Sequence, residues 1–264
     1  MREKLSITIV AYHNYDDIQE AVRTIEQFTN SCISKRIYIV DNSEWVHKEN
    51  EEAVNRFQTV LNGYTDIEYI SVDKNIGFGK GHNLVLPKLE SEYHAIVNPD
   101  ILLNSDAFSA IINYMEHNPD VGMCIPKLIN ENGDCLHVYR KEVTILDMFI
   151  RMFCANWFTK RQAEHTLQNM DYSQPFQVPF GQGSFLVIKT ELFKELNGFD
   201  DRFFMYMEDA DLCKRVNQVS KLMYYPDASV IHKWERGSHR NKKLLKYHLQ
   251  SMKKYFNKWG YKWM

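Results

Sequence analysis

Three acidic side chains gather in one short segment of the chain, where they could act on a proton. Glu208, Asp209 and Asp211 follow a run of aromatic residues and methionines at 203–207. Clustered carboxylates raise one another's proton affinity, so that one of them can serve as a general base. The alternative interpretation is structural, because acidic residues also favour the first turn of a helix, and helical spacing continues after Asp211.

A further carboxylate is placed where it could hold a metal ion. Asp100 closes the motif Asn98-Pro99-Asp100, in which proline fixes the backbone beside it. A divalent cation held by one carboxylate and by phosphate oxygens would neutralise a diphosphate leaving group. His232, which follows the apolar segment 228–231, could complete such a site. The alternatives are a Pro-Asp turn and a hydrogen-bonded structural histidine.

Glycines alternate with other residues in the segment 75–83, which reads Asn-Ile-Gly-Phe-Gly-Lys-Gly-His-Asn. At Gly77, Gly79 and Gly81 the missing side chain would let backbone amides approach a phosphate or a sugar. The pattern does not match G-x-G-x-x-G, and it lacks the Lys-Ser/Thr ending of a P-loop. By itself this loop indicates a close approach of the backbone, without naming the ligand.

The elements that would position these motifs alternate through the first half of the chain. We predict strands at 5–11, 36–40, 67–72 and 94–97 and helices at 18–28 and 106–117. Such alternation predicts a mostly parallel sheet with helices on both faces. Asp41, Asp73 and Asp100 follow three of the strands, at the edge where open α/β sheets bind their ligands. The tendency of Asp to form turns would also place it there.

The pattern becomes less regular from Pro126 onward. We predict a hairpin around Asn132-Gly133, an insertion over the aromatic and Met-rich stretch 148–158, a strand at 183–188, a helix from Thr190 and a final helix at 242–258.

Composition predicts a compact globular protein in a reducing compartment. The 264 residues are 44% hydrophobic, enough to bury a sizeable core without crosslinks. The five cysteines are an odd number without a C-x-x-C pair, which argues against a disulfide framework and a zinc knuckle. No signal-like stretch follows Met1, and the most apolar window, 145–158, contains Asp147 and Arg151 and is too short to cross a bilayer. We expect a cytoplasmic protein without a transmembrane helix.

Charge is distributed unevenly along the chain. Residues 233–264 carry ten Lys or Arg and one acid, a net charge of +9, which leaves −11 for residues 1–232. Apolar residues recur at spacings of three and four in this tail, namely Leu245, Leu249, Met252 and Phe256. An apolar face flanked by cations suits an anionic membrane, here the inner face of the plasma membrane. The alternative is a helix that packs on the rest of the protein and exposes its lysines.

Together these segments resemble glycosyltransferase family 2, specifically its rhamnosyltransferase-like branch, which builds O-antigen, capsule and other bacterial surface polysaccharides. The resemblance covers almost the whole chain. Its motifs are 7–14, Val40-Asp41-Asn42-Ser43, Asn75-Ile76-Gly77-Phe78-Gly79, Asn98-Pro99-Asp100, Gly183-Ser184-Phe185, Asn197-Gly198-Phe199-Asp200, 204–212, and Tyr225-Pro226 with His232.

The resemblance implies an α/β fold of the GT-A type, Rossmann-like, with a mostly parallel sheet and a C-terminal helical extension. The catalytic domain would span 1–237, with a nucleotide-sugar-binding half at 1–125 and an acceptor half at 126–237. The basic amphipathic helix would occupy 238–264.

The resemblance also implies how the donor is bound. Asp41 would contact the nucleotide base. The other nucleotide-sugar-binding residues would be Asn75, Gly77, Phe78, Gly79, Asn98 and Asp100. The donor implied is dTDP-L-rhamnose, although galactofuranosyl and other hexosyl transferases share much of this pattern.

For the reaction, the resemblance implies a metal ion and a general base. Asp100 and His232 would hold Mg²⁺ or Mn²⁺ under the diphosphate, because Asn98 stands where many GT-A enzymes carry Asp. Asp209, with Glu208 beside it, would take the proton of the acceptor hydroxyl in a single displacement that inverts the anomeric centre. The acceptor implied is a saccharide on a polyprenyl diphosphate.

Two other functions fit part of the pattern. Sugar nucleotidyltransferases share the sheet and the metal carboxylate, but they usually carry a Gly-rich, Lys/Arg-containing loop after the first strand, where this chain has Tyr12-His13-Asn14. A non-catalytic nucleotide-sugar-binding subunit would not need both Asp100 and Asp209. We expect no nucleic-acid partner.

Overall fold

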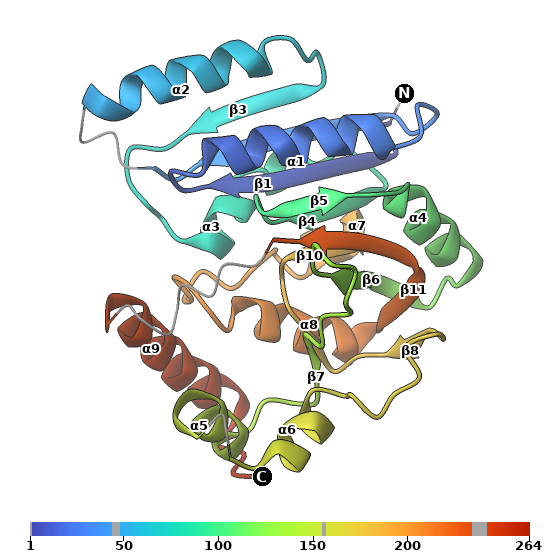
Figure 1. Ribbon diagram of the computed structural model, residues 1–264, viewed down its shortest axis with the longest axis vertical. Helices are drawn as coiled ribbons and strands as arrows, with labels where there is room; N and C mark the ends of the chain where they lie inside the picture. The colour runs from blue at the N-terminus through green and yellow to red at the C-terminus, as the bar shows by residue number, and fades with distance from the viewer. Residues whose placement is uncertain (1, 44–47, 155–156, 234–241) are drawn as a thin grey trace.

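The computed structural model of the chain describes residues 2–43, 48–154, 157–233 and 242–264. Figure 1 shows a central sheet with helices packed against it and, below the sheet, several short elements together with the long C-terminal helix α9 (Lys242–Trp259).

Within the described residues, nine strands form the central sheet. They are β1 (Leu5–Ala11), β2 (Lys35–Asp41), β3 (Ile67–Ser71), β4 (Tyr93–Val97), β5 (Ile101–Leu103), β6 (Val121–Ile129), β8 (Phe176–Gln177), β10 (Phe185–Lys189) and β11 (Lys221–His232). Their order is β3-β2-β1-β4-β10-β6-β11-β5, with β8 paired to β11 outside this path. The two remaining strands, β7 (Tyr139–Arg140) and β9 (Phe180–Gly181), pair with each other.

The strands predicted in the first half of the chain form a parallel block. β1 lies between β2 and β4, and β2 pairs in parallel with β3. Every residue of β1 and β4 is buried, as expected for apolar strands that are covered on both faces. The carboxyl ends of these four strands therefore lie at the same edge of the sheet.

The rest of the sheet is mixed. β10 runs antiparallel to both β4 and β6, and β5 runs antiparallel to β11, whereas β6 and β11 are parallel. β10 has this direction because the chain enters it beside the end of β4, where the amide of Asn98 donates a hydrogen bond to the carbonyl of Ser184. The α/β fold class is confirmed, and parallel pairing holds for β3, β2, β1 and β4 and for β6 with β11.

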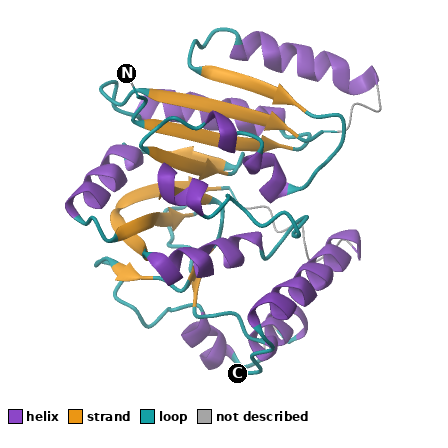
Figure 2. Cartoon of the chain, turned by 180° about the vertical axis from the view of Figure 1, so that it is seen from behind, coloured by secondary structure: helices purple, strands orange, loops and turns teal. Residues whose placement is uncertain are grey.

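Helices cover both faces of the sheet. Besides α9 they are α1 (Tyr15–Phe28), α2 (Lys48–Leu61), α3 (Phe78–Asn83), the 3-10 helix η1 (Leu86–Lys88), α4 (Ala107–His117), α5 (Ile145–Phe153), α6 (Thr159–His165), α7 (Thr190–Glu195) and α8 (Glu208–Val219). α1 and α4 contact β5, β6 and β11, whereas α3 and α7 contact β1, β4 and their neighbours. Figure 1 shows α1 in front of the sheet, and Figure 2 shows short helices on the opposite face. None of the helices in the described ranges is long and apolar enough to span a membrane.

The stretch predicted as an insertion joins the C-terminal tail in the lower part of the molecule. The amides of Ile145 and Leu146, at the start of α5, donate hydrogen bonds to the carbonyls of Lys262 and Trp263. The predicted turn at Asn132-Gly133 is present, since Gly133 has a φ of +86° and its amide bonds to the carbonyl of Asn130.

α9 packs against the domain along a face that includes Met252 and Phe256 of the predicted one but not Leu245 and Leu249. Ser251, Tyr255 and Phe256 are buried, and the Ser251 hydroxyl donates a hydrogen bond of 2.8 Å to the carbonyl of Met205. Of the predicted apolar positions Phe256 is buried, but Leu245 and Leu249 remain 39% and 46% exposed. The first half of the helix also packs, because the rings of Tyr247 and His248 contact those of Phe204 and Tyr206. The predicted boundary at 237/238 lies outside the described residues.

Candidate active site

A two-residue turn in the left-handed conformation sets the direction of the acidic segment that begins α8. Tyr206 and Met207, immediately before α8, both have a φ of +68°. Such backbone costs of order 1–3 kcal/mol for each residue and persists only where the surroundings enforce it. Here the glycine-rich loop provides support, because the amide of Phe78 donates a hydrogen bond to the carbonyl of Phe204.

Asp209 is a partly exposed carboxylate held by backbone donors. The amide of Gly183 donates to its Oδ2 at 3.2 Å, and the amide of Ala210 donates to its Oδ1 at 2.8 Å. Burial raises the pKa of Asp209, while these bonds and the charges of Arg140 and Arg151 act in the opposite direction. The result is a carboxylate that has raised proton affinity but is stabilised when ionised, which suits a general base.

Glu208 is more deeply buried than Asp209. It is 6% exposed, and its Oε2 has no hydrogen-bond partner among the described residues. Burial and the neighbouring charge of Asp209 raise the pKa of Glu208 to about 8. Burial therefore favours the neutral form of Glu208, whereas the two backbone donors favour the charged form of Asp209.

Asp211, the third acid of the cluster, has a structural role. Its fully buried carboxylate lies 2.7 Å from Nε of Arg215 and 2.5 Å from Nζ of Lys258, and it accepts a hydrogen bond of 2.8 Å from Nε1 of Trp259. The last two partners belong to α9. Asp211 thus attaches the C-terminal helix to α8 and points away from Asp209.

The glycine-rich loop is explained first by close packing. Gly77 has a φ of +96°, and a Cβ there would lie 2.3 Å from the carbonyl oxygen of Phe204. A Cβ on Gly79 would lie 2.9 Å from Cβ of Phe199. These glycines let the loop lie directly against the turn before α8, so two motifs far apart in the sequence become one structure. Their contact with a nucleotide stays a prediction.

Two polar side chains shape this loop. Oδ1 of Asn75 accepts a hydrogen bond of 2.9 Å from the amide of Gly77, and Nδ2 of Asn42 donates one of 3.0 Å to the Gly77 carbonyl. Asn42 follows β2 directly. The loop is thereby tied to the carboxyl end of a sheet strand.

Asp41, the last residue of β2, is fully buried, and both of its carboxylate oxygens accept hydrogen bonds. Its Oδ2 accepts hydrogen bonds from the hydroxyls of Tyr15 at 2.9 Å and Tyr69 at 2.5 Å, and its Oδ1 accepts one from the amide of Ser43. The predicted contact with a nucleotide base is untested, and a base would share these oxygens with protein donors.

Asp100 and His232 lie side by side, although 132 positions separate them. Nε2 of His232 is 3.1 Å from Oδ2 of Asp100, because β11 pairs antiparallel with β5 and sets His232 opposite Ile101. Oδ1 of Asp100 and Oδ1 of Asn98 are buried without a hydrogen-bond partner among the described residues. Orphaned oxygens beside an imidazole fit a divalent cation. The described part of the chain has no group of three or more His, Cys, Asp or Glu arranged for a metal, so substrate or water oxygens would have to complete the coordination.

The predicted site residues did not include the arginine pair near Asp209, although Arg140 is a candidate charge stabiliser if no metal binds. Arg140, on β7, is 8% exposed, and its guanidinium carbon lies 5.3 Å from the ring centre of Phe180. Burial and then the charge of Arg151 lower the pKa of Arg140 to about 9. Arg151 lies on α5, and its presence inside the most apolar window of the chain was the signal that could have found it.

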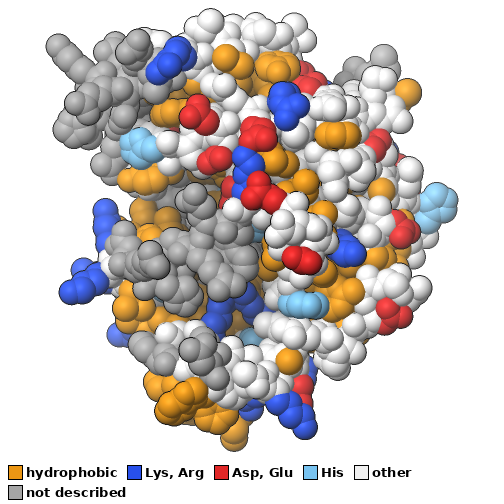
Figure 3. All heavy atoms as spheres, in the orientation of Figure 1, with side chains coloured by type: hydrophobic (Ala, Val, Ile, Leu, Met, Phe, Trp, Pro, Cys, Tyr) orange, Lys and Arg blue, Asp and Glu red, His pale blue; other side chains and the backbone are white. Residues whose placement is uncertain are grey.

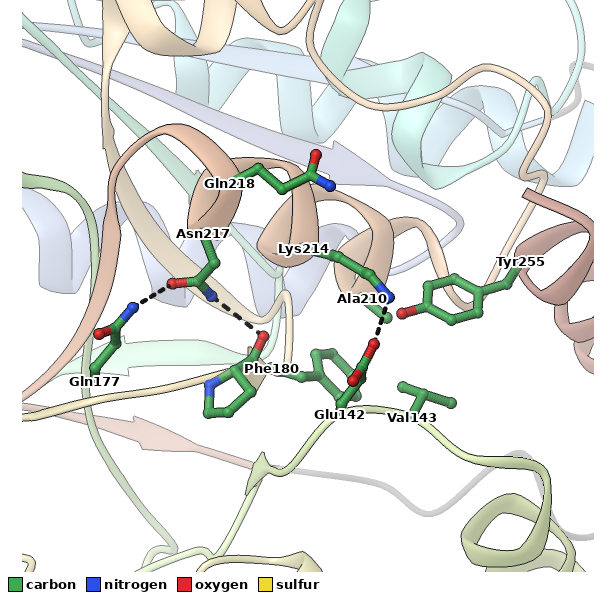
Figure 4. Close-up of a pocket in the computed structure, with 10 residues that line it drawn as sticks. Glu142, Val143, Gln177, Phe180, Ala210, Lys214, Asn217, Gln218 and Tyr255 are labelled. Atoms are coloured by element: carbon green, nitrogen blue, oxygen red, sulfur yellow. Dashed lines mark hydrogen bonds and ion pairs between the residues drawn. The ribbon is translucent and has the colours of Figure 1, made fainter. Parts of the chain in front are cut away.

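A cavity of about 520 Å³ lies beside α8 but contains none of the predicted site residues. Figure 4 shows its walls joined by hydrogen bonds and an ion pair. Nε2 of Gln177 donates to Asn217, Nδ2 of Asn217 donates to backbone carbonyls, and Lys214 pairs with Glu142. Because these polar groups satisfy one another, the cavity offers few free groups to a ligand.

The family of the chain follows from comparison with models of known protein families. A model of glycosyl transferase family 2 matches residues 6–196, more than half of the chain, and this region includes Asp41 and Asp100. The chain belongs to glycosyl transferase family 2. In this family 2 protein, Asp209 and His232 lie beyond the matched region, so their place in the site comes from the structure.

Curated relatives of this family 2 protein include rhamnosyltransferases. Rhamnosyltransferase WbbL of Escherichia coli K12 is 26% identical over 221 residues, which cover 79% of this chain and 80% of WbbL. N-acetylglucosaminyl-diphospho-decaprenol L-rhamnosyltransferase of Mycobacterium tuberculosis is 24% identical over 189 residues, covering 66% of this chain. The matched residues span 61% of the mycobacterial protein's length.

Solved structures show the same GT-A fold. GalNAc-T7 with UDP, GalNAc and Mn²⁺ has a TM-score of 0.67 at 15% identity, covering 95% of this chain and 48% of GalNAc-T7. Mannosyltransferase PcManGT of Pyrobaculum calidifontis with GDP-Man and Mn²⁺ has a TM-score of 0.66 at 16% identity, covering 97% and 65%. At these identities the likeness concerns the fold alone.

Proposed function

We propose that this family 2 protein is an inverting glycosyltransferase that moves L-rhamnose from dTDP-L-rhamnose onto a saccharide carried on a polyprenyl diphosphate. Family membership and the rhamnosyltransferases among its relatives support the proposal. The observation that carries it is the setting of Asp209, a partly exposed carboxylate that accepts a hydrogen bond from the Gly183 amide and lies next to the buried Glu208.

In the proposed reaction, Asp209 accepts the proton of the acceptor hydroxyl while that oxygen bonds to the anomeric carbon of the donor. The bond from this carbon to the diphosphate oxygen breaks on the opposite face, and the nucleoside diphosphate leaves with the electron pair. A single displacement inverts the configuration. The Gly183 amide holds the carboxylate in place, and Glu208 remains a neutral neighbour.

Asp100 and His232 would hold Mg²⁺ or Mn²⁺, with the Asn98 oxygen close enough in the chain to assist. The cation would neutralise charge on the departing diphosphate. The orphaned buried oxygens of Asp100 and Asn98 support this assignment. The Mn²⁺ in the structures of GalNAc-T7 and PcManGT agrees with it.

The donor would bind along the edge between β2 and the glycine-rich loop. Asp41 would contact the nucleotide base, and Asn75, Gly77, Phe78 and Gly79 would form the wall of the pocket. The hydrogen bond from Asn42 to the Gly77 carbonyl supports this arrangement, because it fixes the loop beside the end of β2.

We also propose that the protein works in the cytoplasm, at the inner face of the plasma membrane, and that the first half of α9 contacts the lipid. Leu245 and Leu249 are exposed there, whereas Tyr255 and Phe256 are buried against the domain. Lysines on the same helix would meet anionic headgroups, at about 1 kcal/mol each.

The test of function is product release from dTDP-L-rhamnose, measured with and without a rhamnose-free lipid-linked saccharide. The expected product is dTDP, released rapidly only when the acceptor is present, together with a glycoside of inverted configuration by NMR. Release of pyrophosphate from dTTP and a sugar phosphate would instead identify a nucleotidyltransferase. Saturable donor binding without turnover for any acceptor would identify a non-catalytic subunit.

A further inference from the structure

Two arginines near Asp209 form no direct ion pair with an acid in the described part of the chain. Among the described residues, neither Arg140 nor Arg151 forms an ion pair within 4.0 Å or a side-chain hydrogen bond, and the Arg140 Nε is buried without a partner. Arg161, on the neighbouring helix α6, is by contrast paired with Asp147 at 2.7 Å. A buried guanidinium without a counter-charge costs several kcal/mol unless something else satisfies it.

The local charges do not balance within the described residues. Asp209 is the acid that acts on both arginines, and Glu208 beside it is mainly neutral at pH 7. Burial lowers the pKa of His165 to about 4, so this neighbour adds no charge of its own. Among the described residues, two cations therefore lie near one carboxylate. One further anion would balance the charge of the site.

The position of the pair indicates which anion it would take. β7 and α5 belong to the part of the chain after residue 126, which is the predicted acceptor half. Figure 3 shows Lys and Arg side chains together in the lower half of the face that it draws. A group bound by Arg140 and Arg151 would lie near Asp209, where the acceptor hydroxyl must be.

We propose that Arg140 and Arg151 form a binding site for a phosphate or diphosphate group of the acceptor. The planar guanidinium matches two phosphate oxygens at once, and a partly desolvated site strengthens that interaction. The inference rests on the proposed function for the reaction that follows binding. The inference adds that the enzyme selects saccharides whose reducing end is phosphorylated, because the two arginines bind this phosphate.

The first test is direct binding, which does not need turnover. Geranyl diphosphate and geraniol are titrated into the wild-type protein and into Arg140→Met, Arg151→Met, Arg151→Lys and the matched control Arg161→Gln. We expect the diphosphate to bind and the alcohol not to bind. Each Met variant should lose roughly 10- to 100-fold in affinity, Arg151→Lys less, and Arg161→Gln little.

The source of the phosphate is distinguished by titrating dTDP with Mg²⁺ into the same variants. Unchanged dTDP affinity assigns the site to the acceptor. A loss of dTDP affinity that equals the loss for geranyl diphosphate would overturn the proposal, because the arginines would then serve the donor.

Thermal unfolding separates binding from a structural role. Replacing an uncompensated cation by Met should leave the melting temperature of the ligand-free protein unchanged or raise it. Geranyl diphosphate should raise the melting temperature of the wild type but not of the Met variants. Lower melting temperatures with unchanged affinity for geranyl diphosphate would assign the arginines to the fold and overturn the proposal.

Turnover then tests selection of the substrate. The same saccharide is offered as a lipid diphosphate and as a neutral alkyl glycoside. Arg151→Met should raise KM roughly 10-fold or more for the diphosphate and little for the glycoside. Equal increases for both acceptors would contradict the proposal. If no saccharide is transferred at all, the proposed function fails, while the binding result still decides whether this anion site exists.

Discussion

The amide of Gly183 donates a hydrogen bond of 3.2 Å to Oδ2 of Asp209, and a Cβ on Gly183 would lie only 3.0 Å from Cβ of Asp209. Gly183→Ala should therefore displace the carboxylate without touching the donor side. Because displacements on the scale of 1 Å cost up to about 10²-fold in rate, we expect kcat to fall at least about tenfold with donor affinity retained. Wild-type kcat in this variant would show that the contact does not position the base.

Asp209→Asn should nearly abolish transfer but leave binding of the nucleotide sugar intact, because the base acts on the acceptor. Loss of a general base typically costs about 10² to 10⁴ in rate. Asp211→Asn is the matched control, since it weakens the contacts to Arg215 and Lys258 and should mainly lower the melting temperature. If Asp209→Asn keeps more than about a tenth of the turnover, Glu208 becomes the candidate base.

Glu208 should make the protein less stable as the pH rises. Its pKa increases from 4.5 to about 8 on folding, so over this range the folded state keeps a proton that the unfolded chain releases. The contribution is fully present below about pH 4.5 and is lost as the pH passes through about 8. Glu208→Gln stays neutral throughout, so urea denaturation at several pH values should show a flatter dependence than in the wild type. Identical dependences would mean that Glu208 is ionised in the folded protein.

Asp100→Ala should weaken donor binding and remove its dependence on divalent cations. Titration of dTDP with and without Mg²⁺ measures this directly, and His232→Ala should have a similar but smaller effect. Asp73→Ala is the control, because Asp73 also follows a strand but is exposed. Full activity of the wild type in excess EDTA would refute the metal site and direct attention to basic side chains such as Lys80 or Arg140 as charge stabilisers.

The exposed leucines of α9 should matter for membranes more than the helix as a whole. Truncating α9 would remove Lys258 and Trp259 and so uncover the carboxylate of Asp211. The sharper variant is therefore Leu245→Glu with Leu249→Glu. We expect this variant to lose co-sedimentation with anionic liposomes and to keep its melting temperature. Val219→Glu, an exposed position on α8, is the control. Binding that is equal in all three proteins, or insensitive to salt, would leave α9 as an ordinary packed helix.

The local patterns of the sequence were sufficient for the parallel half of the fold. β1, β2 and β4 are apolar runs whose burial depends on their own composition, and their ends place Asp41 and Asp100 at one edge of the sheet. The acidic segment and the start of α8 were likewise predicted from spacing. These features could be predicted because they depend on residues that are neighbours in the chain.

Only the tertiary structure decided which acid is the candidate base, which acid is structural, and which distant residues pair. Asp209 and Asp211 are two positions apart on a helix, so they point in directions about 200° apart, and what each meets depends on how α8 packs. Asp211 forms an ion pair with Lys258 of α9, while Asp209 accepts a hydrogen bond from the Gly183 amide and feels the charges of two arginines. Their roles differ because each carboxylate takes its solvation and its partners from elements that the chain delivers from far away.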